Sequence, residues 1–168
     1  PDFPTGGIVQ GIDGIRSAFE TGRGKIIVKA KVEIVADKQD NKIVITEIPY
    51  GIIKSKLVEQ IADLIDAKKL PLVEDIVDES TTDVRIVITP KNRNIPTDKM
   101  MAHLFAMTDL EYKFNMNFNV VDSNGAPRVM PIGDVLREFI AHQKNVLLRR
   151  TKWRLGNIER RLEILGGL

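Results

Sequence analysis

The sequence contains no cysteine, and other residues that commonly carry catalysis are few. The absence of Cys excludes disulfide scaffolds, Cys-ligated metals and cysteine nucleophiles. The two histidines, His103 and His142, lie in separate helical patterns without a second His or a carboxylate at ligand spacing. This pattern favours surface or half-packed side chains over a metal site. Because no G-x-S-x-G nucleophile motif occurs either, an independent small-molecule enzyme has little support.

Long apolar runs are also missing. No stretch approaches the ~20 apolar residues that cross a bilayer, and no basic segment leading into an apolar core marks a signal peptide at Pro1. With 168 residues, 43% hydrophobic and 29% charged, the composition excludes a disordered or collagen-like chain. A globular chain of this length buries roughly 70% of its unfolded surface.

The opening segment, Pro1 to Gly7, holds two Pro and two Gly and does not begin with Met. This composition is typical of an extended linker. We therefore expect the chain to be a fragment of a longer polypeptide.

Charge is distributed unevenly along the chain, although the net charge is only +2. Of the 25 basic and 23 acidic side chains, residues 133–168 hold 8 basic and 4 acidic. The C-terminal segment is thus positive and the remainder slightly negative. This asymmetry hints at a polyanionic partner without establishing one.

Alternating apolar and polar residues predict several strands. A polar turn at Asp37–Asn41 joins the first two strands into a hairpin, and the acidic stretch Val73–Ser80 has a mixed pattern. The turn Ser123-Asn124-Gly125 sends the last strand back towards Arg128–Met130. The predicted strands are Ile26–Val35, Lys42–Ile48, Val84–Thr89 and Phe114–Val120.

Apolar residues at helical spacing predict four helices, at Gly14–Glu20, Lys54–Lys68, Thr97–Ala106 and Ile132–Leu165. Thr97 is the expected N-cap of the third helix. The last segment lacks Pro and is long enough for a single helix of ~50 Å. Its late apolar residues follow the 3, 4, 3 spacing of a coiled-coil seam, at Leu155, Ile158, Leu162 and Leu165.

These elements together predict an α+β fold. A mixed or antiparallel sheet with packed helices is expected in residues 1–131, because a helix on a sheet buries both apolar stripes. The first helix of a long coiled coil is expected in residues 132–168.

The glycine-flanked loop Gly22-Arg23-Gly24-Lys25 invites comparison with a phosphate-binding loop. That motif would need Gly where Phe19 stands and Ser or Thr where Ile26 stands, so a nucleotide-binding P-loop is excluded. Four carboxylates in the mixed segment could hold a divalent ion, but no Gly-centred calcium loop surrounds them and a solvated rim is favoured. They are Glu74, Asp75, Asp78 and Glu79.

Cations near strand and helix starts are the better functional signal. Five of them are candidate DNA-binding residues, namely Arg23, Lys25, Lys29, Lys54 and Lys56. Together they could follow a phosphate backbone. Lys54 and Lys56 lie in the first turn of a predicted helix, whose N-terminal N–H groups also favour an anion. The alternative, solvated surface lysines, stays open. The cations of the last helix wind around it, which favours a solvated or partner-facing coil over a nucleic-acid stripe.

Six motifs along nearly the whole chain resemble, in order and spacing, the A subunit of bacterial type IIA DNA topoisomerases. They are Pro1-Asp2-Phe3-Pro4-Thr5-Gly6-Gly7, Thr21-Gly22-Arg23-Gly24, Glu47-Ile48-Pro49-Tyr50, Asp78-Glu79-Ser80, Arg149-Arg150-Thr151 and Ile164-Leu165. Within that group, the stretches Lys68–Asp75 and His103–Glu111 look more like topoisomerase IV than gyrase. One departure is Thr81-Thr82-Asp83-Val84, where relatives often carry a longer, Gly-containing turn.

The resemblance implies a tower domain beside a bent DNA duplex, with Arg23, Lys25 and Lys54 as phosphate contacts. The family's catalytic tyrosine follows an Arg, whereas Tyr50 follows Pro49 and Tyr112 follows Glu111, so no catalytic residue is expected here.

The resemblance also implies partners and a location. They are double-stranded DNA, a second A subunit and the B subunit of topoisomerase IV, which uses Mg²⁺ and ATP; no cofactor or metal is expected in this segment. The expected location is cytoplasmic, at the nucleoid. Two alternatives stay open: the corresponding part of the DNA gyrase A subunit, and a protein-interaction scaffold without DNA contact.

Overall fold

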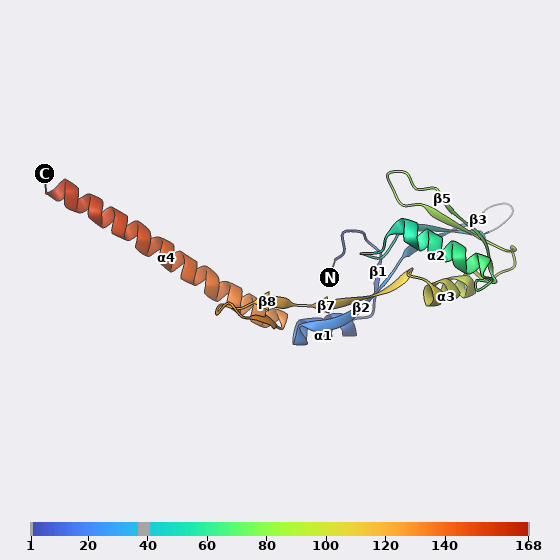
Figure 1. Cartoon of the computed structure of the whole chain (residues 1–168), viewed down its shortest axis with the longest axis horizontal. Coiled ribbons are helices and arrows are strands. Elements are labelled where there is room, and N and C mark those ends of the chain that lie inside the picture. Colours follow the sequence, from blue (N-terminus) through green and yellow to red (C-terminus); the bar gives the residue numbers. More distant parts are fainter. Residues whose placement is uncertain (1, 37–40, 168) are drawn as a thin grey trace. The chain divides into compact units, whose positions relative to one another are not determined.

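The computed structural model describes residues 2–36 and 41–167 and has an α+β fold (Figure 1). The chain divides into two compact units. The first unit comprises Pro1–Ile15 and Lys25–Asn115, and the second comprises Arg16–Gly24 and Met116–Leu168. The predicted domain boundary at residue 131 stays a prediction.

In chain order the elements are β1 (Ile8–Gln10), α1 (Asp13–Thr21), β2 (Arg23–Lys29), β3 (Lys31–Ala36), β4 (Asn41–Glu47), α2 (Lys54–Asp66), β5 (Val73–Asp78), β6 (Ile86–Pro90), α3 (Thr97–Met107), β7 (Glu111–Asn117), β8 (Asn119–Val121), β9 (Pro127–Val129) and α4 (Ile132–Gly166).

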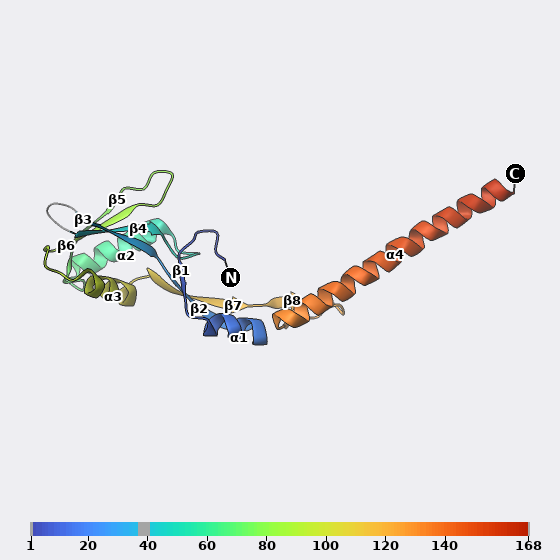
Figure 2. The same ribbon diagram turned by 180° about the vertical axis from the view of Figure 1, so that it is seen from behind.

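The core of the first unit lies between an antiparallel sheet and two helices. The sheet has the strand order β3-β4-β6-β5, and α2 and α3 pack against it (Figure 2). The isoleucines of the central strands β4 and β6 share one buried cluster with apolar residues of both helices. Fully buried members are Ile43, Ile45, Ile86, Ile88, Leu57, Ile61, Met100 and Leu104.

The predicted strand Ile26–Val35 was wrong as a single element, because the chain changes sheets at Ala30. Its first part, β2, belongs to a three-stranded sheet of order β1-β2-β7, whereas β3 belongs to the four-stranded sheet. The Ala30 N–H donates to the Leu110 carbonyl at 2.8 Å, and the β3–β4 register shifts between Lys31 and Val32. Apolar alternation continues across Ala30, so the pattern could not reveal the change of partner.

The predicted hairpin is confirmed for β3 and β4, whose paired residues run from Lys31 with Glu47 to Ala36 with Asn41. Most of the predicted turn, residues 37–40, lies outside the described residues.

Two further predictions in the first unit need correction. The mixed segment Val73–Ser80 contains the edge strand β5, whose register shifts between Val73 and Asp75, so its inward apolar residues are spaced by three instead of two. Thr97 is not the N-cap of α3; that position is Pro96, and no side chain caps the helix.

The predicted strand Phe114–Val120 is also two strands, because the chain changes partners at Phe118. The Phe118 N–H donates to the Gly22 carbonyl at 2.8 Å, and its carbonyl accepts from the Met130 N–H at 3.1 Å. The β8–β9 hairpin and its turn are as predicted, with Gly125 at φ +80°. Figures 1 and 2 both show this hairpin beside the first turns of α4.

The predicted last helix is confirmed as α4, which is 35 residues long and contains no buried residue. Its predicted seam residues are all more than half exposed. Among the described residues, no helix is long and apolar enough to cross a membrane.

We predict that Ile61→Ala destabilises the protein by about 2–5 kcal/mol, because it removes a fully buried side chain from the core between sheet and helices. The free energy of unfolding in urea measures this. The control Ile34→Ala, at an exposed position of β3, should cost less than about 1 kcal/mol. Equal costs for the two variants would contradict the assigned core.

Gly22→Ala should destabilise the protein for two reasons. Gly22 has φ +81°, which costs an L-residue about 1–2 kcal/mol, and an added Cβ would lie 2.6 Å from the Met130 carbonyl oxygen. The matched control is Gly125→Ala, which has φ +80° but nothing within 4 Å of the new Cβ. We expect Gly22→Ala to cost a further ~1–3 kcal/mol over this control in urea unfolding. A larger loss for Gly125→Ala would refute the close approach.

Candidate nucleic-acid interface

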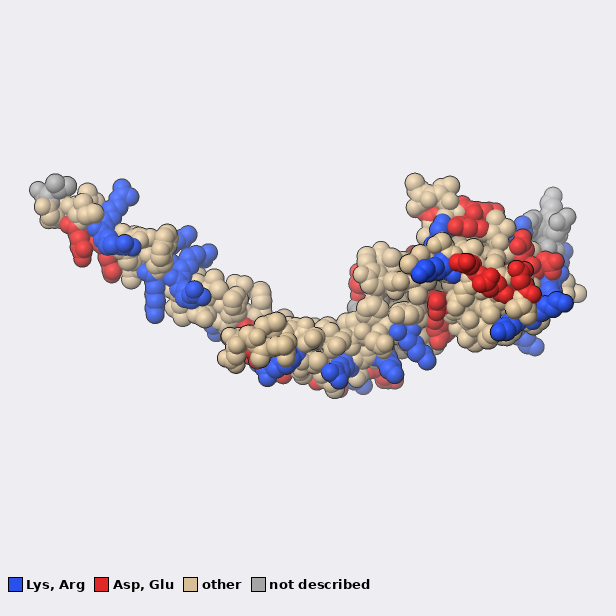
Figure 3. Space-filling model, in the orientation of Figure 1, with Lys and Arg blue, Asp and Glu red and all other residues tan. Residues whose placement is uncertain are grey.

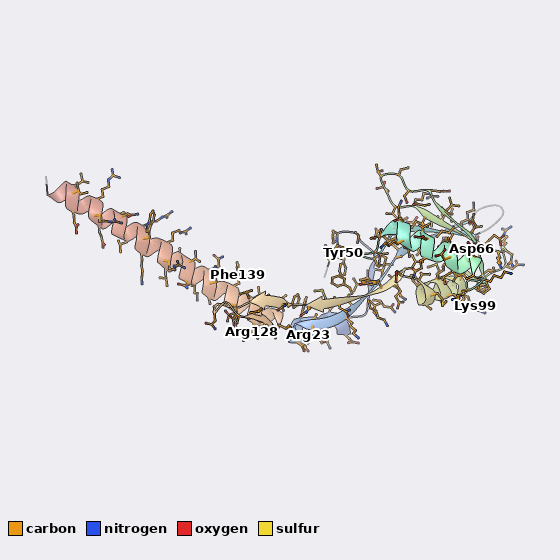
Figure 4. The ribbon with its side chains drawn as sticks, viewed as in Figure 1. Arg23, Tyr50, Asp66, Lys99, Arg128 and Phe139 are labelled. Atoms are coloured by element: carbon orange, nitrogen blue, oxygen red, sulfur yellow. The ribbon has the colours of Figure 1, made fainter. Side chains whose placement is uncertain are left out.

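Arg23 has a fixed backbone and a free side chain. Its carbonyl accepts hydrogen bonds from the Ser17 hydroxyl at 2.9 Å and the Thr21 hydroxyl at 3.0 Å, and its N–H donates to Thr21 Oγ1 at 3.2 Å. Figure 4 shows Arg23 beside α1, at the start of β2. Within the described part of the chain, the exposed guanidinium makes no ion pair. It is therefore available to an external anion.

Lys25 and Lys29 share one face of β2, because Ile26 and Val28 turn into the core on the other. Lys25 is exposed and has no carboxylate partner in residues 2–36 or 41–167. Lys29 is half-buried, pairs with Glu111 at 3.3 Å and lies 4.8 Å from the centre of the Phe105 ring. Lys29 thus has internal partners that Lys25 lacks.

The first turn of α2 presents two lysines beside uncapped N–H groups. The N-cap is Ile53, which offers no side-chain hydrogen bond, and the first turn contains no acidic residue. A helix end of this kind attracts negative charge. Lys56 is exposed and unpaired among the described residues, whereas Lys54 contacts Asp78 at 2.7 Å.

The Lys54–Asp78 pair links the start of α2 to the end of β5. Hydrogen bonding from Lys54, followed by that from Ser80, lowers the pKa of Asp78 to about 2. Of the other carboxylates in the acidic stretch, Glu79 pairs with Arg85 at 3.0 Å. Sequence reasoning missed both pairs because their members meet only through strand pairing and helix packing.

The two tyrosines lie in different surroundings. Tyr50 packs against Phe3 and Phe114 with ring centres 5.8 and 5.9 Å away (Figure 4). Tyr112 is partly exposed beside a shallow hollow that also includes Gln60 and Met107. In the described ranges, no three His, Asp or Glu residues gather closely enough to hold a metal ion.

The second unit has a separate apolar hollow between the β8–β9 hairpin and the start of α4. Its volume is about 420 Å³, and its apolar lining includes Val121 and Phe139. Arg128 supports its rim through Asp122 at 3.5 Å and Glu138 at 3.9 Å (Figure 4). The hollow contains none of the five predicted DNA-binding residues.

Comparison with known sequences defines the family. The model of the family described as the A subunit of DNA gyrase/topoisomerase IV matches residues 1–168. The A subunit of DNA topoisomerase 4 from Caulobacter vibrioides is 48% identical over 174 residues, covering 100% of this chain and 22% of the relative. The protein of that name from Rickettsia bellii is also 48% identical, over 100% of this chain and 23% of the relative. The DNA gyrase A subunit from Chlamydia muridarum is 41% identical over 99% of this chain and 20% of the relative.

The match over all residues places this chain in a family of type IIA DNA topoisomerase subunits. It belongs to the family formed by the A subunits of DNA gyrase and topoisomerase IV. The chain spans about a fifth of the length of the curated relatives it matches.

The Lys54–Asp78 pair predicts a pH-dependent stability. Because the folded-state pKa of Asp78 is about 2 and its ordinary value is 3.8, the pair stabilises the fold above about pH 4, and this stabilisation is lost as the pH falls through 2. Asp78→Asn should therefore unfold more easily than the unsubstituted chain at pH 7, with the difference closing near pH 2. Unfolding free energies at several pH values measure this.

The matched control for this pair is Glu74→Gln, on the same exposed strand without an ion pair among the described residues. It removes the same charge and should change stability little at any pH. A difference for Asp78→Asn that persists unchanged at pH 2 would contradict the role of the ionised pair.

Proposed function

We propose that this chain is the DNA-holding tower segment of the topoisomerase IV A subunit, followed by the first helix of its coiled coil. The observation that carries the DNA-binding role is the exposure of Arg23, Lys25 and Lys56 without carboxylate partners among the described residues. The family's relatives are named for DNA topoisomerase and DNA gyrase. Topoisomerase IV is preferred over gyrase because the relatives of that name are 46–48% identical, against 41–42% for the gyrase subunits.

The cations would contact phosphates and would not read bases. Arg and Lys on a strand face and a helix start hold a duplex by its backbone, which positions it without sequence preference. Contacts that form only when the duplex curves offset part of the cost of bending it. Lys29 and Lys54 remain candidate phosphate contacts, but Lys29 would have to share its charge with Glu111, and Lys54 with Asp78.

In the complete enzyme, residues outside this segment would cut and rejoin the DNA. In this proposal, the A subunits form a homodimer, and the B subunit supplies the Mg²⁺- and ATP-dependent steps of double-strand passage, decatenation and relaxation. The segment alone would neither cut nor rejoin DNA, because neither Tyr50 nor Tyr112 follows an Arg.

The exposed apolar residues of α4 favour a second candidate function, a protein-binding scaffold.

The triple variant Arg23→Gln, Lys25→Gln, Lys56→Gln should weaken binding to a labelled duplex, measured by fluorescence anisotropy at several salt concentrations. Loss of three phosphate contacts should reduce the slope of log affinity against log salt by up to about 2.7.

The control variant Lys69→Gln, Lys91→Gln, Arg93→Gln removes the same charge from exposed positions and should have a smaller effect. Salt-independent binding, or unchanged affinity in the first variant, would favour the scaffold. Nicking of plasmid by this chain alone would contradict the proposal that residues outside this segment cut the DNA.

A further inference from the structure

The middle of α4 carries positive charge without any acidic residue. No Asp or Glu occurs between Glu138 and Glu159, and this stretch contains five basic residues, Lys144, Arg149, Arg150, Lys152 and Arg154. All five are exposed and make no ion pair among the described residues. Figure 3 shows blue side chains along this part of α4, with red ones closer to its C-terminal end.

The ends of the same helix differ from its middle. Near the start, Arg137 pairs with Asp134 at 2.9 Å. Near the end, Arg160 donates to the Asn157 side chain at 2.6 Å and to the Gly156 carbonyl at 3.2 Å. In the middle, Arg150 and Arg154 are instead like charges four residues apart, which destabilises a helix. An external polyanion would relieve this repulsion.

Helix geometry separates part of this charge from the apolar seam. At about 100° per residue, Arg149 lies on the side of α4 opposite the seam residues Leu155 and Ile158. Trp153 lies one turn beyond Arg149 on that same side and is 67% exposed. Arg150 and Lys152 lie on the two opposite flanks of α4, each about 100° around the helix from the seam. A helix packed along the seam would therefore leave Arg149 and Trp153 facing outward, with one cation on each flank.

We propose that Arg149, Arg150 and Lys152, with Trp153 among them, form a second contact site for the phosphate backbone of duplex DNA. The inference rests on the proposed DNA-binding function and extends it to α4. Charge complementarity supports duplex DNA as the occupant, because the duplex presents one negative charge per ~1.7 Å of its axis. The cations wind around α4 as the sequence indicates, but Arg149 lies opposite the seam, and Arg150 and Lys152 flank it within one turn of the helix.

Trp153 provides a local reporter, because it is the only tryptophan in the sequence. Titration of the full chain with an unlabelled duplex should change Trp153 emission saturably, and added salt should reverse the change. A labelled duplex, followed by anisotropy, gives the affinity and its salt slope in parallel.

The test compares two arginine pairs on the same side of the same helix. Arg149→Gln, Arg150→Gln should reduce the salt slope by about 1.8, because two phosphate contacts are lost. The control Arg160→Gln, Arg161→Gln lies about three turns further along, next to Glu159 and Glu163, and removes the same charge. This control variant should reduce the salt slope by less than half of the reduction expected for Arg149→Gln, Arg150→Gln.

The outcomes separate this inference from the proposed function. If only the Arg23, Lys25, Lys56 variant loses affinity and Trp153 emission stays constant, α4 is not a DNA site and the proposed function stands. If neither variant loses affinity, both fail. Equal losses for the two arginine pairs would also overturn the site, because they would reflect net charge alone. A Trp153 response to an acidic polypeptide but not to DNA would assign α4 to a protein partner.

Discussion

The buried contact between the β4 and β6 isoleucines and the inner faces of α2 and α3 is the interaction on which the first unit depends. It sets the spacing between sheet and helices, and therefore where the first turn of α2 lies relative to the end of β5. Lys54 and Asp78 meet because of that packing, while Lys56 stays in solvent. The two lysines at the start of α2 are thus positioned by a core that contains neither of them.

The second unit is organised differently. Backbone hydrogen bonds through Phe118 join the strand region to Gly22 and Met130, and the β8–β9 hairpin lies against the start of α4. Beyond that hairpin, α4 has no buried residue. A helix without tertiary packing depends on its own hydrogen bonds and on partners for its exposed seam. This leaves its outward cations free of internal constraint.

Much of the secondary structure was predictable from periodicity. The helices α2 and α4 follow strong apolar patterns, and the β8–β9 hairpin follows its turn residues. Failures occurred where the chain changes partners without interrupting its pattern, at Ala30 and Phe118, and where a register shift alters the pattern, in β5. In the candidate site, the residue types and their surface positions were predictable. The sequence did not indicate which lysines form ion pairs, since Glu111 and Asp78 lie far from Lys29 and Lys54 in sequence.

The sequence by itself determined the family, the helical and strand segments with regular periodicity, and the acid-free stretch of α4, because each depends on residues near one another in the chain or on motifs in order. Only the tertiary structure decided which sheet each strand joins, which cations are paired and which carboxylate has its pKa lowered. Those properties come from contacts between distant segments, and such contacts depend on packing and hydrogen-bond geometry that local patterns do not contain.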